Sequence, residues 1–445
     1  MITKTIHVAW ISALFLIGQL HAQTKHEFTV LQAADYAKKN NVQVKNALLD
    51  VKIQQEMNRE LTAQALPSLT GFGNATDNVK LATQLLPGEL AGQPAGTFIP
   101  VTFGTKYVVN GGFSLRQALF DGQVFIGLKA RSSSIDVKQK TVDITANTIN
   151  KNVYKIYYQL VVAKKQVELI DSNISRLEKL QHDTREIYKN GFAEKIDVDK
   201  TEVQLANLQT QRIKTISNID GGYYSLKLLM GMPIRDSLVL TDEITDDQLK
   251  QGLLQEKFQY SDRAEYQSFE LQKKLQEYNV RRYKLSYIPT LSLTGNYSYS
   301  GQRTRFDFFD KSGLWFPSTY YGLNLNVPIF EGFAKKARVQ QAKLQLQQSA
   351  NNLENSKLII DNDVEQARVL YESAIKSIDF QRRNMTLAEE VYNQAKKKYE
   401  IGTGSNTEIS AAQTDLVQAQ TNYISSVYDA IIARTDYLYA IGKLP

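Results

Sequence analysis

The chain has 445 residues, of which 42% are hydrophobic, and a formal net charge of +7. It contains no cysteine, which excludes disulfides, thiolate metal sites and a lipid anchor on cysteine. Its 53 basic residues are spread among 46 acids rather than gathered on one face with interleaved aromatics, so nucleic acid is not an expected partner.

The first 22 residues have the composition of a secretory signal peptide. Lys4 lies near the start, an apolar run extends from Val8 to Ile17, and the small residue Ala22 precedes the expected cleavage site. The alternative is a membrane anchor, but the run is shorter than the ~20 residues that a helix needs to cross a bilayer. We therefore expect an exported protein.

A first helix is predicted from the N-cap Thr29 to about Ala65, where Pro67 ends it. Four later segments alternate apolar and polar side chains and are predicted strands: Ser68 to Thr76, Tyr107 to Leu115, Leu291 to Tyr299 and Tyr321 to Ile329. Long loops at 79–106 and 301–319 join each pair. An apolar outer face, a polar inner face and terminal tyrosines are typical of a membrane β-barrel wall. A soluble, half-buried sheet shows the same alternation and is the alternative.

A heptad seam predicts a long helical hairpin, and the seam occurs twice. Its first copy is Ile149, Val153, Ile156, Leu160, Ala163, Val167, Ile170, Ile174 and Leu177. Shifted by 211 residues, the second copy is Ile360, Val364, Ala367, Tyr371, Ala374, Ile378, Gln381, Met385 and Ala388. We expect a helix from Gly122 to Asn190, about 100 Å long at ~1.5 Å per residue, with an antiparallel partner from Lys195 to Met230.

Short motifs flank both seams in the same order. The pairs are Leu66-Pro67 and Ile288-Pro289, Phe120-Asp121-Gly122 and Phe330-Glu331-Gly332, and the Tyr-x-x-Gly turns ending at Gly191 and Gly402. This internal repeat predicts one duplicated unit rather than several domains. We expect repeats at 23–233 and 261–445, each with a helix, two strands and a hairpin, separated by an irregular acidic segment at 234–260.

Four strands are too few to close a barrel by themselves. An open sheet edge in hydrocarbon leaves backbone groups unpaired, at several kcal/mol each. The sequence therefore predicts an oligomer of identical chains, in which two copies give eight strands and three copies give twelve.

The order and spacing of these motifs resemble those of the TolC-like outer membrane efflux proteins, over essentially all of the mature sequence. The resemblance implies a mixed, mostly α fold and a homotrimer with a twelve-stranded barrel in outer-membrane lipid and a periplasmic α-helical tunnel built of coiled-coil hairpins. It also implies docking to a periplasmic adaptor protein and to an inner-membrane pump of the RND or ABC type.

The resemblance also assigns roles to the two hairpin turns. It implies a periplasmic aperture lined by Asp197 and Glu408. It implies adaptor docking at the turns themselves, whose residues are Gly191, Phe192, Ala193, Gly402, Thr403, Gly404 and Ser405. The family pattern is incomplete here, because Ala411 replaces a second acid and Gly404 replaces an arginine that helps lock the mouth.

The acids at the turns also have local interpretations. Residues 405–408 fit a capping box, in which Ser405 and Glu408 satisfy backbone donors. Asp197 fits a first-turn acid favoured by the helix dipole. Gly191 and Gly402 are expected to adopt left-handed backbone conformations.

The four histidines predict no catalytic or metal site. His7 and His21 lie in the signal peptide, His26 lies near the mature terminus, and His182 lies on a predicted helix. We expect neither an enzyme nor a cofactor. The predicted function is a passive outer-membrane exit duct of an efflux or type I secretion system, and the alternative is a structural coiled-coil envelope protein without a pore.

Overall fold

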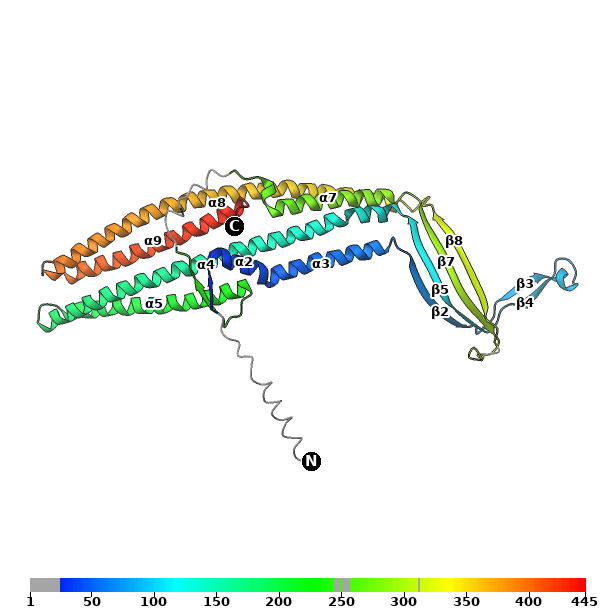
Figure 1. Cartoon of the computed structure of the whole chain (residues 1–445), viewed down its shortest axis with the longest axis horizontal. Coiled ribbons are helices and arrows are strands. Elements are labelled where there is room, and N and C mark those ends of the chain that lie inside the picture. The colour runs from blue at the N-terminus through cyan, green and yellow to red at the C-terminus, as the bar shows by residue number, and fades with distance from the viewer. Residues whose placement is uncertain (1–24, 244–248, 250–256, 311–312) are drawn as a thin grey trace, which may run out of the picture. The chain divides into compact units, whose positions relative to one another are not determined.

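The computed structural model describes residues 25–243, 249, 257–310 and 313–445 (Figure 1). The predicted signal peptide and most of the acidic segment after residue 243 lie outside the described residues. Two compact units are present: one takes the described parts of Met1–Leu49, Gln139–Gln267 and Asn355–Pro445, and the other takes Asp50–Lys138 and Ser268–Glu354. Within the described ranges, no helix has the length and apolarity needed to cross a bilayer.

Two long helical hairpins form most of the chain, as the seam predicted. The first joins α4 (Gly122–Lys189) to α5 (Lys195–Met230), and the second joins α8 (Ala334–Glu400) to α9 (Asn406–Ala440). In the first unit these four helices lie side by side (Figure 1). The seam residues are buried or half-buried throughout. The seam therefore forms the hydrophobic contact surface of each long helix.

The predicted first helix is two helices. Thr29 caps α2 (Val30–Asn40) and forms a reciprocal capping box with Gln32, as the sequence suggested. The chain then leaves the helical region at Asn41, which has φ −59° and ψ 133°, before α3 (Val42–Ala63) begins. The Asn41 carboxamide oxygen accepts from Gln43 N at 2.7 Å and thereby caps the second helix. The prediction of a single helix to about Ala65 was wrong, because the Asn41 side chain accepts a hydrogen bond from the backbone and thereby competes with the continuous helical pattern.

A short parallel pair of strands lies beside these helices, and the sequence did not predict it. Strand β1 (Lys25–Phe28) pairs with β6 (Ser237–Leu240), within the segment expected to be irregular. The buried Tyr157 of α4 donates its hydroxyl to Phe28 O at 2.9 Å and accepts from Thr241 N at 3.2 Å. Tyr157 therefore fixes this pair to the first hairpin.

The second unit contains an antiparallel sheet in the order β2-β5-β7-β8 (Figure 1). Its strands are β2 (Ser68–Asp77), β5 (Tyr107–Phe120), β7 (Thr290–Arg303) and β8 (Phe316–Asn326). A short 3-10 turn (Tyr260–Asp262) and helix α7 (Ala264–Leu285) precede β7.

The fourth predicted strand, Tyr321 to Ile329, was misplaced at both ends, because β8 begins at Phe316 and stops at Asn326. Pro328 explains its C-terminal end, since proline has no N–H for the ladder and restricts the residue before it.

The loop predicted at 79–106 has structure of its own. It contains β3 (Thr83–Pro87), a 3-10 turn (Gly88–Ala91) and β4 (Phe98–Thr102), which pairs with β3 antiparallel. Strand β7 also continues into the second predicted loop as far as Arg303. The first connection therefore has the predicted length but is structured, and the second is shorter than the sequence indicated.

Candidate functional site: the hairpin turns and the sheet

The first hairpin turn depends on a left-handed glycine. Gly191 has φ +82°, and its N–H donates to Tyr188 O at 2.9 Å as α4 ends. Phe192 follows with its side chain 85% exposed, and Ala193 is half-buried. Asp197 lies in the first turn of α5 and is half-buried. This position agrees with the helix-dipole interpretation of the acid.

The second turn repeats this geometry. Gly402 has φ +77°, and both Thr403 N and Gly404 N donate to Lys398 O at 2.9 Å. Ser405 is the N-cap of α9, and its hydroxyl accepts from Glu408 N at 3.1 Å. The expected capping box is therefore only half formed, because the Glu408 carboxylate is directed elsewhere.

That carboxylate pairs with a lysine of its own hairpin. Lys398 Nζ lies 3.0 Å from Glu408 Oε1, and the two side chains are 57% and 46% exposed. No sequence motif indicated this lysine, whose positive charge reduces the negative charge at the predicted aperture. An exposed pair of this kind contributes only ~0–1 kcal/mol to stability, so it leaves Glu408 free to exchange partners.

One side chain links the two turns. Asn406 Nδ2 donates to the Asp197 backbone oxygen at 3.3 Å and to Asp197 Oδ1 at 3.1 Å. Asn406 is buried, whereas Glu408 is exposed. The structure thus brings Asp197 into contact with the start of α9, and sequence reasoning had assigned no role to Asn406.

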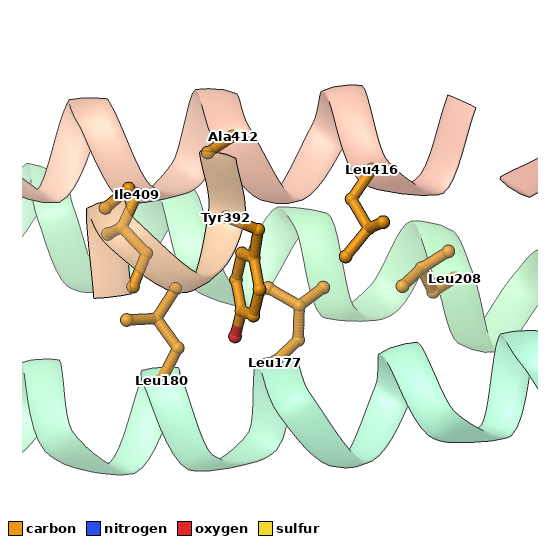
Figure 2. Packing of buried hydrophobic residues seen from close by; sticks show 8 residues of the cluster. Leu177, Leu180, Leu208, Tyr392, Ile409, Ala412 and Leu416 are labelled. Atoms are coloured by element: carbon orange, nitrogen blue, oxygen red, sulfur yellow. The ribbon is translucent and has the colours of Figure 1, made fainter. Parts of the chain in front are cut away.

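A hydrophobic cluster holds the four helices together behind the turns. It contains the side chains of Leu177, Leu180, Leu208, Tyr392, Ala395, Ile409, Ala412 and Leu416. Figure 2 shows the Tyr392 ring beside Leu177 and Leu180 of α4, with Ile409 of α9 nearby. Burial of such side chains stabilises a fold by about 1.5–3 kcal/mol each. The cluster therefore stabilises the ends of the four helices that carry the turns.

Next to this cluster, α4 and α9 share a buried polar contact. Asn173 Nδ2 donates to Gln420 Oε1 at 2.7 Å, and Gln413 Nε2 donates to Asn173 Oδ1 at 3.2 Å. Arg176 Nη1 also donates to Asn173 Oδ1, at 3.0 Å. The sequence signal that we missed is the pair of glutamines seven residues apart, which places both on one face of α9.

The sheet places most of its polar side chains on one face and most of its apolar side chains on the other. One polar row consists of Thr70, Ser114, Asn296 and Tyr320, and the adjacent apolar row consists of Leu69, Leu115, Gly295 and Tyr321. Leu69 is 68% exposed and Tyr321 is 89% exposed. The apolar face of the sheet is therefore exposed in a single chain.

Known proteins share both the sequence and the fold. Residues 263–442 match the family model described as outer membrane efflux protein. The outer membrane protein TolC of Salmonella enteritidis is 21% identical over 74% of this chain and 68% of its own length. The chain resembles the TolC-like outer membrane factors.

Further similarities extend to nearly the whole TolC-like chain. A crystal structure of CusC superposes with a TM-score of 0.76 at 16% identity, covering 96% of this chain and 95% of CusC. The proteases secretion protein PrtF of Dickeya chrysanthemi is 20% identical, over 66% of this chain and 63% of PrtF. The hairpins and the sheet therefore form a known fold of outer-membrane channels.

Proposed function

We propose that this TolC-like protein is the exit duct of a tripartite efflux or type I secretion system. It passively conducts drugs, metals or secreted proteins that a periplasmic adaptor and an inner-membrane pump of the RND or ABC type deliver. The similarity to TolC and to a protein named for protease secretion supports export as the task.

The observation that carries the proposal is the sheet's exposed apolar face together with its two edges. Strands β2 and β8 each have one neighbour within the described sheet, so each leaves a row of backbone donors and acceptors unpaired. In a bilayer these groups must find partners, and an identical chain supplies them. A homotrimer gives twelve strands, wide enough for a water-filled lumen, whereas a dimer gives only eight.

The polar face of the sheet then lines the lumen. Its polar residues are mostly hydroxyl and amide side chains, such as Ser114, Asn110 and Asn296, with Arg116 as a charged member. Neutral polar walls bind many solutes weakly, which suits a passage whose selectivity belongs to the pump.

The hairpin turns form the periplasmic mouth in this proposal. Asp197 and Glu408 line the aperture. The turn residues 191–193 and 402–405 are the docking points of the adaptor, because they are largely exposed and Phe192 offers an apolar anchor. The long helices α4, α5, α8 and α9 form coiled coils that surround the tunnel.

Liposome swelling tests the proposed pore. Liposomes loaded with polysaccharide and reconstituted with the purified protein are diluted into an isotonic solution of a small neutral sugar. Open conduits admit the sugar and cause swelling at a rate that rises with protein content. Protein that inserts but leaves the swelling rate at the level of empty liposomes would support the scaffold alternative instead.

A further inference from the structure

Charged side chains are rare in the four-stranded sheet, and one of them differs from the others in its position. The strands contain Asp77, Arg116 and Arg303 as their only charged residues. Asp77 ends β2 and Arg303 ends β7, and both lie in the same row as Tyr107, at the end of the sheet remote from α4. Arg116 instead lies within β5, four residues before the end of this strand at Phe120.

The register places Arg116 on the polar face of the sheet. Ser68, Thr294 and Gly322 share its row, and Ser114 precedes it on the same face. These neighbours are small, and the arginine side chain is exposed. The guanidinium group can therefore extend into the space that this face borders.

Arg116 also has no acid that neutralises its charge. In the part of the chain that the structure describes, no ion pair or hydrogen bond involves its side chain. The acids of the two strand-to-helix junctions have other partners. Asp121 Oδ1 accepts from Gln123 N at 2.8 Å. Glu331 Oε1 lies 3.0 Å from Lys335 Nζ. The five N–H donors of the guanidinium group thus remain available to a ligand.

An exposed arginine on a soluble sheet would be ordinary solvated surface. In the proposed duct, however, β5 crosses the membrane, where ionisable residues are rare and generally mark the path of ions or substrates. An arginine on the lipid side of a barrel is destabilising, whereas a change on the lumen side alters selectivity. The polar face is the lumen side, so the position of Arg116 favours a role in the passage of solutes.

We propose that Arg116 binds the carboxylate or phosphate groups of transported solutes inside the barrel. The inference rests on the proposed function and adds to it the chemical class of solute. The symmetry of a homotrimer places three copies of Arg116 at one level around the lumen. A planar guanidinium group binds these oxyanions through two parallel hydrogen bonds, and a ring of arginines in a pore favours anions.

This ring has the opposite charge to the proposed aperture. Asp197 and Glu408 at the aperture attract cations, whereas Arg116 attracts anions. Removing the charge of Arg116 should therefore raise the preference of the channel for cations, and removing that of Glu408 should lower it. Reversal potentials across a salt gradient distinguish the two sites by the sign of the change.

Block of the channel current by tripolyphosphate tests the site directly, with this polyanion as the probe. The natural full-length protein and each variant are reconstituted in planar bilayers at ~0.1 M salt, where the Debye length is ~10 Å. We expect Arg116→Gln to raise the half-blocking concentration about tenfold, because a charge-assisted contact is lost. Arg116→Lys keeps the charge and should retain much of the block. The control Ser114→Gln, on the same face of the same strand, should leave the block unchanged.

The outcomes separate this inference from the proposed function. Equal block of the natural protein and of Arg116→Gln would overturn the anion site and leave the duct intact. A natural protein that forms no channel at all would contradict the proposed function itself.

A second variant keeps the test decisive if Arg116→Gln assembles poorly. The natural chain contains no cysteine, so Arg116→Cys introduces a single thiol. Water-soluble thiosulfonate reagents that attach either a cationic or an anionic group are added to the open channel. The cationic group should restore the block by tripolyphosphate, and the anionic group should not. Identical block after both reagents would contradict the assignment of Arg116 to the lumen.

Discussion

Asn406 Nδ2 donates to both the backbone oxygen and the carboxylate of Asp197, at 3.3 and 3.1 Å. This contact is the direct polar link between the two hairpin turns of a chain. We expect Asn406→Ala to lower stability by about 1 kcal/mol, the typical net contribution of such a bond. Hydrogen exchange should accelerate at residues 191–199 and 402–409. The exposed neighbour Thr407, changed to alanine, should leave the exchange rates unaltered, and equal effects of the two variants would argue against the link.

Gly191 and Gly404 are required for different reasons. Substitution by asparagine at each position distinguishes the two reasons. Gly191 has φ +82° and open space around an added Cβ, so only its backbone conformation resists substitution. At Gly404 a Cβ would lie 2.9 Å from Lys398 Cβ and 3.0 Å from Tyr399 N. Asparagine tolerates left-handed backbone far better than alanine does. Gly191→Asn should therefore stay within about 1 kcal/mol of the natural protein, whereas Gly191→Ala costs about 1–2 kcal/mol.

Gly404→Asn, by contrast, should lower the thermal midpoint as much as Gly404→Ala. Thermal unfolding in detergent measures all four variants. If Gly404→Asn had a higher thermal midpoint than Gly404→Ala, a steric clash of the Cβ would not be the reason for glycine at position 404.

The buried Asn173–Gln420 contact should show strong coupling between its two residues. Asn173→Leu leaves the Gln413 and Gln420 carboxamides without this partner, which costs about 1–3 kcal/mol. Adding Gln420→Leu replaces polar by apolar atoms on both sides. The double variant should therefore be at least ~0.5 kcal/mol less destabilised than the sum of the single variants. Simple additivity in denaturant titrations would mean that the hydrogen bond contributes little.

The proposed aperture predicts opposite effects from Glu408 and Lys398. Removing acids with Glu408→Ala and Asp197→Ala should reduce preference for cations, because less negative charge faces the passage. Lys398→Gln removes the cation 3.0 Å from Glu408 and should increase that preference. Reversal potentials across a salt gradient measure both effects, which should shrink at high ionic strength. Identical reversal potentials for all variants would indicate that these residues only cap helices and form surface ion pairs.

Much of the helical fold was predictable because the heptad seam is long and occurs twice. Gly191 and Gly402 have left-handed φ at the turns that the sequence predicted. The break at Asn41 escaped prediction because it depends on a local side-chain cap rather than on periodicity. The β1·β6 pair escaped because it joins segments about 210 residues apart, which no local pattern reveals.

The candidate site was less predictable than the fold. Spacing after the turn glycines identified Asp197 and Glu408, and both lie in first helical turns. Their partners, Asn406 and Lys398, depend on how the hairpins pack, so no motif indicated them.

Planar-bilayer recording tests the central claim most directly, namely that copies of the chain assemble into an open conduit. Purified protein added to one side should produce discrete, long-lived conductance steps, and each step should correspond to a single trimer. A protein that is trimeric and membrane-inserted but electrically silent at every voltage would contradict the account.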